Sequence, residues 1–375
     1  MKLQFKKFGK DLMYKPKLQY IFCPMRDRSL WMQLSLIKYL NSFGQEPYLV
    51  FPRPEDKLND KIIENTLSKA GALYQDGRNI VREENPDYDV MFSESSGSSY
   101  SFEKRHLIES KRKNKINIKL NVSISINRSI INTHYTPDKT KDTLSGIYMK
   151  GQRTIDHFKT FTKDLFFINT GDPDWDIFNT NEFKEKIKQT RKKYGKKFLL
   201  LGISFSGPKQ EIIWCERAIE RAITLGITPV VRVHSYRERF VPDSLRPYVD
   251  LETPRFVLFA AASHVIENIG STMIAECLYL NRKVGVTGLI GHFGGYGEAH
   301  VWFEKYNEWK MVTLPRVGKE IFNIVPRAVT VKEIDKFLSD DNILYNEKMI
   351  DDIFGWKRVP SYCSQLFSKI EKKIK

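Results

Sequence analysis

The chain has 375 residues, of which 41% are hydrophobic, 28% charged and 13% aromatic. This composition excludes a largely disordered protein, and the length allows two domains that each bury a core. The formal net charge of +16 indicates partners that carry phosphate or carboxylate groups, such as nucleotides, acidic glycans, anionic lipid surfaces or nucleic acid.

Basic residues gather in four clusters, at the two termini and in two expected helices. The clusters run over Lys2–Lys17, Lys104–Lys115, Lys186–Lys197 and Lys369–Lys375. No stretch approaches the roughly 18 apolar residues of a membrane span, and charged residues interrupt the apolar runs that a signal peptide needs. We therefore expect a cytoplasmic protein that meets an anionic membrane, at its inner face, only as a peripheral protein.

The four cysteines, Cys23, Cys215, Cys277 and Cys363, lie far apart and lack metal-ligand spacing. The first three stand among apolar residues, which indicates reduced, structural thiols. His292 and His300 with Glu298 lack the i, i+4 spacing of a helical metal site, so we expect no bound metal.

The first half of the chain alternates strand and helix patterns. The expected strands are Leu18–Cys23, Pro47–Phe51, Asp89–Ser93, Ile116–Ile126 and Leu165–Asn169, and the expected helices are Leu30–Phe43, Leu58–Ala70, Phe102–Lys113 and Ile147–Phe158. Such alternation predicts a parallel sheet with helices on both faces. The Gly- and Pro-containing loop Thr170–Asp176 ends this part, and the first domain is placed at residues 1–177.

The second half repeats the alternation. The expected strands are Phe198–Ile203, Thr228–Val233, His264–Glu267 and Lys283–Val286, and the expected helices are Glu182–Tyr194, Glu211–Leu225, Phe256–Ala262, a helix from Met273 onward, Val331–Leu338 and Ile343–Ile350. A second α/β domain is placed at residues 178–355. The amphipathic helix Ser361–Ile374, in segment 356–375, is expected to pack back on the N-terminal domain.

One stretch of the second half has the pattern of a phosphate site. The strand that begins at His264 leads into Gly270-Ser271-Thr272 and then into a helix. Free amides, two hydroxyls and the positive end of a helix dipole favour phosphate, and Gly270 lets a ligand approach the backbone. Glu276, one turn later, is suited to accept hydrogen bonds from a ribose or sugar hydroxyl. An ordinary capped helix remains the alternative.

Three further segments leave the carboxyl ends of neighbouring strands, where ligands of such sheets bind. They supply Ser206 and Gly207 from one loop, Arg232 and His234 from the end of the next strand, and the glycine-rich loop with Gly291, His292, Gly294 and Gly295. We expect the first four of these residues to bind a phosphate-bearing donor. The glycine-rich loop is expected to cover the donor's sugar, since its spacing does not match a dinucleotide fingerprint.

The order of these parts resembles the second half of GT-B nucleotide-dependent transferases. The closest likeness is to CDP-glycerol glycerophosphotransferases and related bacterial surface-polysaccharide glycosyltransferases, over about residues 145–290. Arg232-Val233-His234-Ser235 resembles the family's Arg-x-His-Pro without the proline, and Gly270-Ser271 resembles its Ser-Ser or Gly-Ser pair. Gly171-Asp172-Pro173 stands near its Gly-Asn-Pro. The resemblance implies two Rossmann-like domains whose parallel sheets face a central cleft, with His234, Ser271 and Thr272 on the donor diphosphate.

The resemblance also implies a function. We expect a metal-independent glycosyltransferase that moves a sugar from a nucleotide-activated donor to a glycan or lipid-linked acceptor at the cell surface, with no cofactor. The alternatives are a CDP-polyol phosphotransferase and a UDP-sugar 2-epimerase. A nucleic-acid-binding protein is not expected, because the basic residues are not interleaved with aromatics in a recognisable module.

The acceptor side departs from the family. The family commonly carries a His-Gly pair at the end of an N-terminal strand as the acceptor-side base, whereas this chain has Ser125-Ile126-Asn127-Arg128 at the corresponding point. The candidate bases are instead Asp27, Glu94 and His134, and an ordinary loop role remains open for each.

Overall fold

The structure is a computed structural model of residues 1–375. It describes residues 14–23, 27–45, 47–50, 80–81, 87–93, 101–120, 144–148, 152–159, 165–203, 209–233, 241–268, 273–287, 298–303, 308–313, 325–340, 359 and 361–374. The chain forms two compact units that meet in sequence between Ile177 and Phe178. Among the described residues, unit 1 holds 14–177 and 359–374, and unit 2 holds 178–340.

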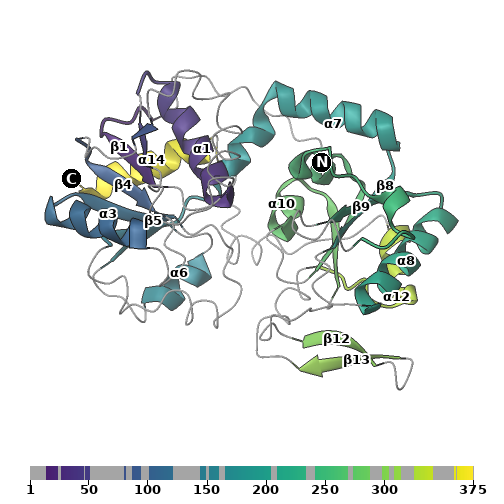
Figure 1. The fold of residues 1–375 in the computed structure, drawn as a ribbon. Helices are drawn as coiled ribbons and strands as arrows, with labels where there is room; N and C mark the ends of the chain where they lie inside the picture. Colours follow the sequence, from purple (N-terminus) through teal and green to yellow (C-terminus); the bar gives the residue numbers. More distant parts are fainter. Residues whose placement is uncertain are drawn as a thin grey trace. The chain divides into compact units, whose positions relative to one another are not determined.

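Unit 1 is built on a seven-stranded sheet in the order β3-β2-β1-β4-β5-β6-β7 (Figure 1). Its strands are β1 (Tyr20–Cys23), β2 (Tyr48–Val50), β3 (Ile80–Val81), β4 (Val90–Ser93), β5 (Ile116–Leu120), β6 (Gly146–Tyr148) and β7 (Phe166–Ile168). Its helices are α1 (Asp27–Asn41), α3 (Ser101–Arg112), α6 (Gln152–Lys159), the 3-10 helix η3 (Pro173–Asn179) and α14 (Tyr362–Ile374). All neighbouring strands pair in parallel, as the alternating sequence pattern predicts.

The two faces of this sheet bury separate hydrophobic clusters. Phe22 and Phe92 pack with residues of α1 and α14 on one face. Their chain neighbours Cys23 and Met91 pack with residues of α3 and α6 on the other face. This division follows from the two-residue period of side chains along a strand, and it explains why β1 and β4 carry apolar residues on both faces.

Helix α14 belongs to unit 1 although it ends the chain. At its start, the Asp176 carboxylate accepts hydrogen bonds from Ser361 Oγ at 2.7 Å and from the amides of Tyr362 at 2.7 Å and Cys363 at 3.1 Å. Such a carboxylate satisfies amides that have no partner within the helix. The apolar stripe of α14 then completes the cluster over β1 and β4.

Unit 2 holds a four-stranded parallel sheet in the order β11-β10-β8-β9 and a separate antiparallel hairpin, β12 with β13. Its strands are β8 (Phe198–Ile203), β9 (Thr228–Val233), β10 (His264–Asn268), β11 (Lys283–Thr287), β12 (Glu298–Phe303) and β13 (Glu308–Thr313). Its helices are α7 (Asn181–Tyr194), α8 (Lys209–Thr224), the 3-10 helix η5 (Arg246–Tyr248), α9 (Arg255–Ala261), α10 (Met273–Tyr279) and α12 (Val331–Ser339).

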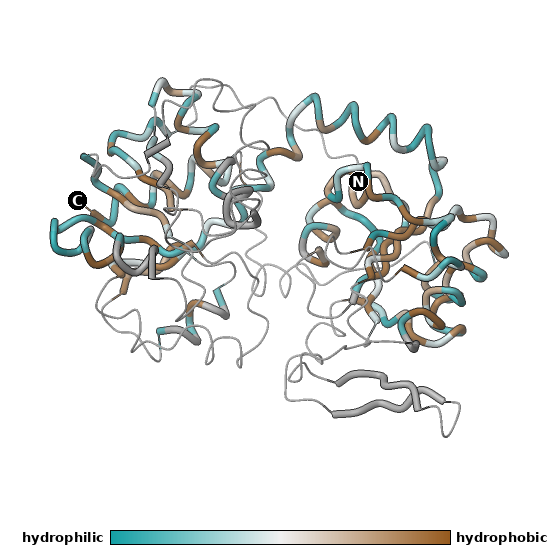
Figure 2. The backbone as a smooth tube through the Cα atoms, in the orientation of Figure 1, coloured by the Kyte–Doolittle hydropathy of each residue, from teal (hydrophilic) through white to brown (hydrophobic). Residues whose placement is uncertain are grey.

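The sheet of unit 2 is also covered on both faces (Figure 1). Leu201 and Ile266 pack with residues of α8 and α12 on one face, where Trp214 also donates from its ring nitrogen to the carbonyl of Ala328 at 2.9 Å. Helices α9 and α10 pack together on the opposite side. In Figure 2 the strands are mainly hydrophobic and α7 is almost entirely hydrophilic.

Most expected elements occur within a few residues of their predicted bounds, and β8 and β9 match them. The prediction of one helix over Ile147–Phe158 is wrong. The segment begins as strand β6, and the helix α6 starts only at Gln152, because the apolar run before it is buried in the sheet. The loop predicted at Thr170–Asp176 becomes helical from Pro173 onward. The predicted helices Leu58–Ala70 and Ile343–Ile350 lie outside the described residues.

Candidate functional site

The carboxyl ends of the four parallel strands in unit 2 lie along one edge of the sheet. The strands end at Ile203, Val233, Asn268 and Thr287. In sheets of this kind, ligands bind where the strands end and the connecting loops begin. The candidate site is therefore built from the last residues of these strands and the segments that follow them.

One row of residues crosses the sheet just before this edge. Gly202 on β8 pairs with Arg232 on β9, and the register that pairs Leu201 with Ile266 places Glu267 of β10 beside Gly202. Leu201 and Ile266 pack against α8 and α12. Because successive side chains of a strand point to opposite faces of the sheet, the residues of this row face away from α8 and α12. An arginine, a glycine and a glutamate thus share that face.

The Glu267 side chain lies directly over Gly202. A Cβ atom added at Gly202 would overlap the carboxylate of Glu267, so position 202 must remain glycine for the carboxylate to keep this place. Glu267 is only 2% exposed. A buried carboxylate is costly in free energy and is retained where polar neighbours or a function compensate for the cost.

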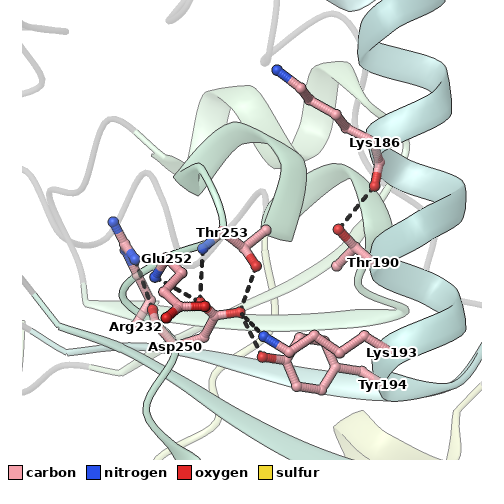
Figure 3. Close-up of polar contacts among 8 residues, drawn as sticks. All are labelled: Lys186, Thr190, Lys193, Tyr194, Arg232, Asp250, Glu252 and Thr253. Carbon is pink, nitrogen blue, oxygen red and sulfur yellow. Dashed lines mark hydrogen bonds and ion pairs between the residues drawn. The ribbon is translucent and has the colours of Figure 1, made fainter. Parts of the chain in front are cut away.

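Arg232 continues the row at the outer strand of the sheet and is partly exposed. Its guanidinium donates from Nη1 to the backbone carbonyl of Asp250 at 2.7 Å. Figure 3 shows Arg232 on one side of Asp250, with Lys193 and Tyr194 of α7 on the other side. This contact orients a cationic side chain next to the candidate site.

Asp250 is itself held by several donors. Its carboxylate accepts from Tyr194 Oη at 2.5 Å, Thr253 Oγ1 at 2.6 Å and Lys193 Nζ at 3.3 Å, and from the amides of Glu252 and Thr253 (Figure 3). Burial alone would raise the pKa of Asp250, but these hydrogen bonds to Thr253, Tyr194 and Lys193 lower it to about 2. The Asp250 side chain is therefore charged, and its hydrogen bonds hold in place the backbone carbonyl of the same residue, which accepts from Arg232.

Glu276 lies on α10 and is 5% exposed. Its Oε1 forms an ion pair with Arg255 Nη2 of α9 at 3.6 Å. Burial raises the pKa of the Cys277 thiol, and the negative charges of Glu267 and Glu276 raise it further. The thiol beside these two carboxylates is thus protonated and unreactive, which confirms the prediction of a structural cysteine. The three other cysteines are also buried and free.

The structure describes three of the predicted site residues. Arg232 and Glu276 lie as described above, and Asp27 is the first residue of α1 in unit 1. The other predicted positions lie outside the described residues. These are Glu94, His134, Ser206, Gly207, His234, Gly270, Ser271, Thr272, Gly291, His292, Gly294 and Gly295.

Sequence reasoning did not identify Gly202, Asp250 or Glu267 as site residues. Two signals were available, since Glu267 is an acid directly after the apolar pair Val265-Ile266 and Gly202 interrupts the apolar run of β8. For Asp250 the local sequence shows only the turn to Glu252 and Thr253, whereas its donors Lys193 and Tyr194 come from a distant part of the chain.

No protein-family model matches the sequence, and a search of curated proteins finds no match. The fold, by contrast, is similar to those of solved enzymes along nearly the whole chain. A UDP-N-acetylglucosamine 2-epimerase from Methanocaldococcus jannaschii aligns with a TM-score of 0.55 at 8% identity, covering 95% of this chain and 99% of its own. The complex of Staphylococcus aureus MnaA with UDP has a TM-score of 0.54 at 10% identity, covering 96% and 97%.

A glycosyltransferase is similar to the same degree. The glycotransferase of kitacinnamycin aligns with a TM-score of 0.53 at 12% identity, covering 96% of this chain and 100% of that one. At such low identity the likeness concerns the fold. Together with the two parallel sheets, it shows that the chain has the GT-B fold, an α/β architecture that glycosyltransferases share with UDP-N-acetylglucosamine 2-epimerases.

Proposed function

We propose that the chain is a glycosyltransferase that moves a sugar from a nucleotide-activated donor to a glycan or lipid-linked acceptor of the cell surface. The observation that supports this most is the row of Arg232, Gly202 and Glu267 at the carboxyl edge of a GT-B sheet. Arginine suits a diphosphate, because its planar guanidinium forms paired, charge-assisted hydrogen bonds.

In the proposed donor site, the diphosphate contacts the segments that follow the four strands. Ser271 and Thr272 precede α10 and would donate to phosphate oxygens, with Gly270 allowing close approach. His234, Ser206 and Gly207 would complete the diphosphate contacts, and Glu276 would accept from a ribose or sugar hydroxyl. The glycine-rich loop with Gly291, His292, Gly294 and Gly295 would cover the donor sugar.

The proposed reaction is a displacement at the anomeric carbon of the donor. A base in unit 1, with Asp27, Glu94 and His134 as candidates, removes the proton of the acceptor hydroxyl as the oxygen attacks. The bond from the anomeric carbon to the diphosphate breaks, and the leaving group takes the electron pair. Hydroxyls, amides and Arg232 would stabilise its charge without a bound metal or cofactor.

Calorimetry of the full-length protein with UDP, GDP and CDP tests the donor site. Replacing both Ser271→Ala and Thr272→Ala should weaken binding of the preferred nucleotide about a hundredfold or more, since each lost hydrogen bond to a charged oxygen contributes about 1.5–3 kcal/mol. Arg232→Ala should weaken the same binding. The matched control is Arg246→Ala, an exposed arginine of unit 2. Unchanged affinity in folded variants of all three site residues would reject the site.

A UDP-sugar 2-epimerase is the second candidate, because two structures of that name align with TM-scores of 0.57 and 0.55. Incubation with UDP-N-acetylglucosamine and no acceptor separates the two proposals. An epimerase forms the C2 epimer with the nucleotide still attached, whereas a glycosyltransferase leaves the sugar nucleotide intact until an acceptor is added. Transfer of a polyol phosphate from a CDP-polyol would support the phosphotransferase alternative instead.

As a partner of either enzyme we propose an anionic membrane surface, with the chain at the inner face of the membrane. The net charge of +16 supports this proposal. No helix in the described ranges is long and apolar enough to cross a membrane.

A further inference from the structure

Helix α7 and the two lysines after it form the most one-sidedly charged surface among the described helices of unit 2. Residues 181–197 hold eight basic side chains against two acidic ones. The helices on the other side of the unit are balanced, with three basic and three acidic residues in α8 and two of each in α12. Local solubility therefore does not require the excess on α7, since α8 and α12 lie at the surface of the same unit without one.

The inner side of α7 is fixed to the unit by few contacts. Phe183 and Thr190 are its buried residues. Arg191 donates from Nε to the carbonyl of Ala261 at 3.1 Å and from Nη2 to that of Ala260 at 3.3 Å. At the end of the helix, Tyr194 and Lys193 bind Asp250. These contacts lie on one stripe and leave the opposite side to solvent.

The exposed side carries lysines and no apolar side chain. All the lysines of this segment are exposed: Lys184, Lys186, Lys188, Lys192, Lys193, Lys196 and Lys197. Lys184, Lys188 and Lys192 follow one another at i, i+4 spacing, which places them along one line of the helix. In Figure 2 this helix is hydrophilic along nearly its whole length.

Structural reasons account for only part of this charge. Cations near the end of a helix interact favourably with its dipole, which explains Lys192 and Lys193. The same dipole disfavours cations in the first half, where Lys186 and Lys188 are offset by ion pairs with Glu182 at 2.7 Å and Glu185 at 3.2 Å. Such exposed pairs contribute little. These contacts offset only part of the excess of eight basic over two acidic residues in 181–197, and the remaining excess favours an anionic partner.

The type of cation indicates the kind of partner. The arginine of this segment, Arg191, is used for carbonyls inside the unit, and every exposed cation is a lysine. The planar guanidinium of arginine suits bidentate hydrogen bonds to a single phosphate group. The ammonium group of lysine is a hydrated point charge, which suits attraction to a charged surface. No exposed aromatic residue in 181–197 offers a platform for bases, which argues against single-stranded nucleic acid.

We infer that α7 is the surface by which the protein adsorbs to an anionic lipid membrane, without inserting into it. This rests on the proposed membrane partner and specifies the face that meets it. Lysines in a row along an exposed helix can contact the headgroups of a lipid surface at the same time. Because the contact is electrostatic, it should weaken as salt shortens the Debye length.

The test is cosedimentation of the full-length protein with vesicles of phosphatidylcholine and phosphatidylglycerol in equal parts, and with phosphatidylcholine alone. The variant Lys184→Gln/Lys188→Gln/Lys192→Gln should bind the anionic vesicles on the order of tenfold or more weakly. The matched control is Lys111→Gln/Arg112→Gln/Lys113→Gln, which removes the same charge from exposed residues at the end of α3.

Near-wild-type binding by the α3 variant, with loss in the α7 variant, supports the inference. Equal losses would overturn it, because net charge alone would then govern binding. Absence of wild-type binding to anionic vesicles would also overturn it, as would an α7-dependent preference for an acidic polysaccharide or polynucleotide over lipid. Calorimetry with the preferred nucleotide on the same variants keeps this result separate from the proposed activity, since Lys184, Lys188 and Lys192 are not among the proposed donor-site residues.

Discussion

Helices α7 and α14 carry two of the basic clusters of the chain, yet the fold uses them in opposite ways. In α7 two residues are buried, whereas α14 buries Tyr362, Cys363, Ser364, Leu366, Phe367, Ile370 and Glu371. Both helices are held at one end by an aspartate, Asp250 for α7 and Asp176 for α14. The comparison shows that the width of the apolar stripe, and not the number of lysines, decides whether a basic helix becomes core or surface.

The two helices also differ in how they use acidic residues. In α7 both glutamates lie on the exposed side and pair with lysines. In α14 the carboxylate of Glu371 is directed inward, where it accepts from the hydroxyls of Tyr14 and Tyr20 and from the amides of Lys17 and Leu18. Burial raises the pKa of Tyr14 to about 12, and the hydrogen bond to Glu371 adds to this rise. Glu371 therefore joins the last helix to the chain before β1.

The largest effect is expected from Glu371→Ala. The substitution leaves four donors without this acceptor, and at about 1–3 kcal/mol for each that stays buried we expect a total loss of about 3–5 kcal/mol of unfolding free energy. Urea unfolding measures this. Lys372→Ala, one position along on the exposed side, is the control and should change stability by less than about 0.5 kcal/mol. A loss below about 1 kcal/mol for Glu371→Ala would mean that water replaces the carboxylate.

Asp176→Ala should cost somewhat less, about 2–3 kcal/mol, because it removes the acceptor of Ser361, Tyr362 and Cys363 at the start of α14. Ser361→Ala removes only one of these donors and serves as the graded control. Hydrogen exchange of the α14 amides gives a second measure, since fraying should begin at this end. Equal stability of the two variants would show that Asp176 does not act as the cap.

Asp250→Asn should lower the unfolding free energy by about 2 kcal/mol near neutral pH, because the folded pKa of about 2 lies below the unfolded value of 3.8. Between these two pKa values the folded state binds fewer protons than the unfolded state. The stabilisation is therefore present above the unfolded pKa and is lost as pH falls through the folded pKa. Urea unfolding across the acidic range should show a flatter pH profile for the variant.

Asp176 should show the opposite sign. Burial raises its pKa above 3.8 despite the hydrogen bonds from Ser361, Tyr362 and Cys363. Its contribution to the unfolding free energy is therefore present below the unfolded pKa and is lost as pH rises through the folded pKa. Comparing Asp176→Asn with Asp250→Asn tests both signs in one experiment. Profiles that change in the same direction would contradict this assignment.

The smallest effect on stability is expected from the α7 lysines. Lys184→Gln, Lys188→Gln and Lys192→Gln should each change the unfolding free energy by less than about 0.5 kcal/mol, since these side chains are exposed. Thermal unfolding measures this. A loss above about 1 kcal/mol for any one of them would show that these lysines stabilise the fold. Helices α7 and α14 would then differ less in what they contribute to stability.

Much of the fold follows from local sequence patterns. The runs Phe198–Ile203 and Thr228–Val233 are predicted as strands with the bounds that the structure has, because short, mainly apolar runs between turns and charged helices leave few alternatives. The alternation of such runs with amphipathic helices is sufficient to predict parallel sheets. The stretch Ile147–Phe158 shows the limit, since three apolar residues before a helix fit a strand or a first helical turn equally well.

The sequence by itself determined the type and order of most elements, the α/β class and the charge excess of α7, because these depend on neighbours a few residues apart. Only the tertiary structure decided that Glu267 lies over Gly202, that Asp250 ties Arg232 to α7, and that α14 completes unit 1. These contacts join residues far apart in the chain. Sheet order and register bring them together, and no local pattern records either one.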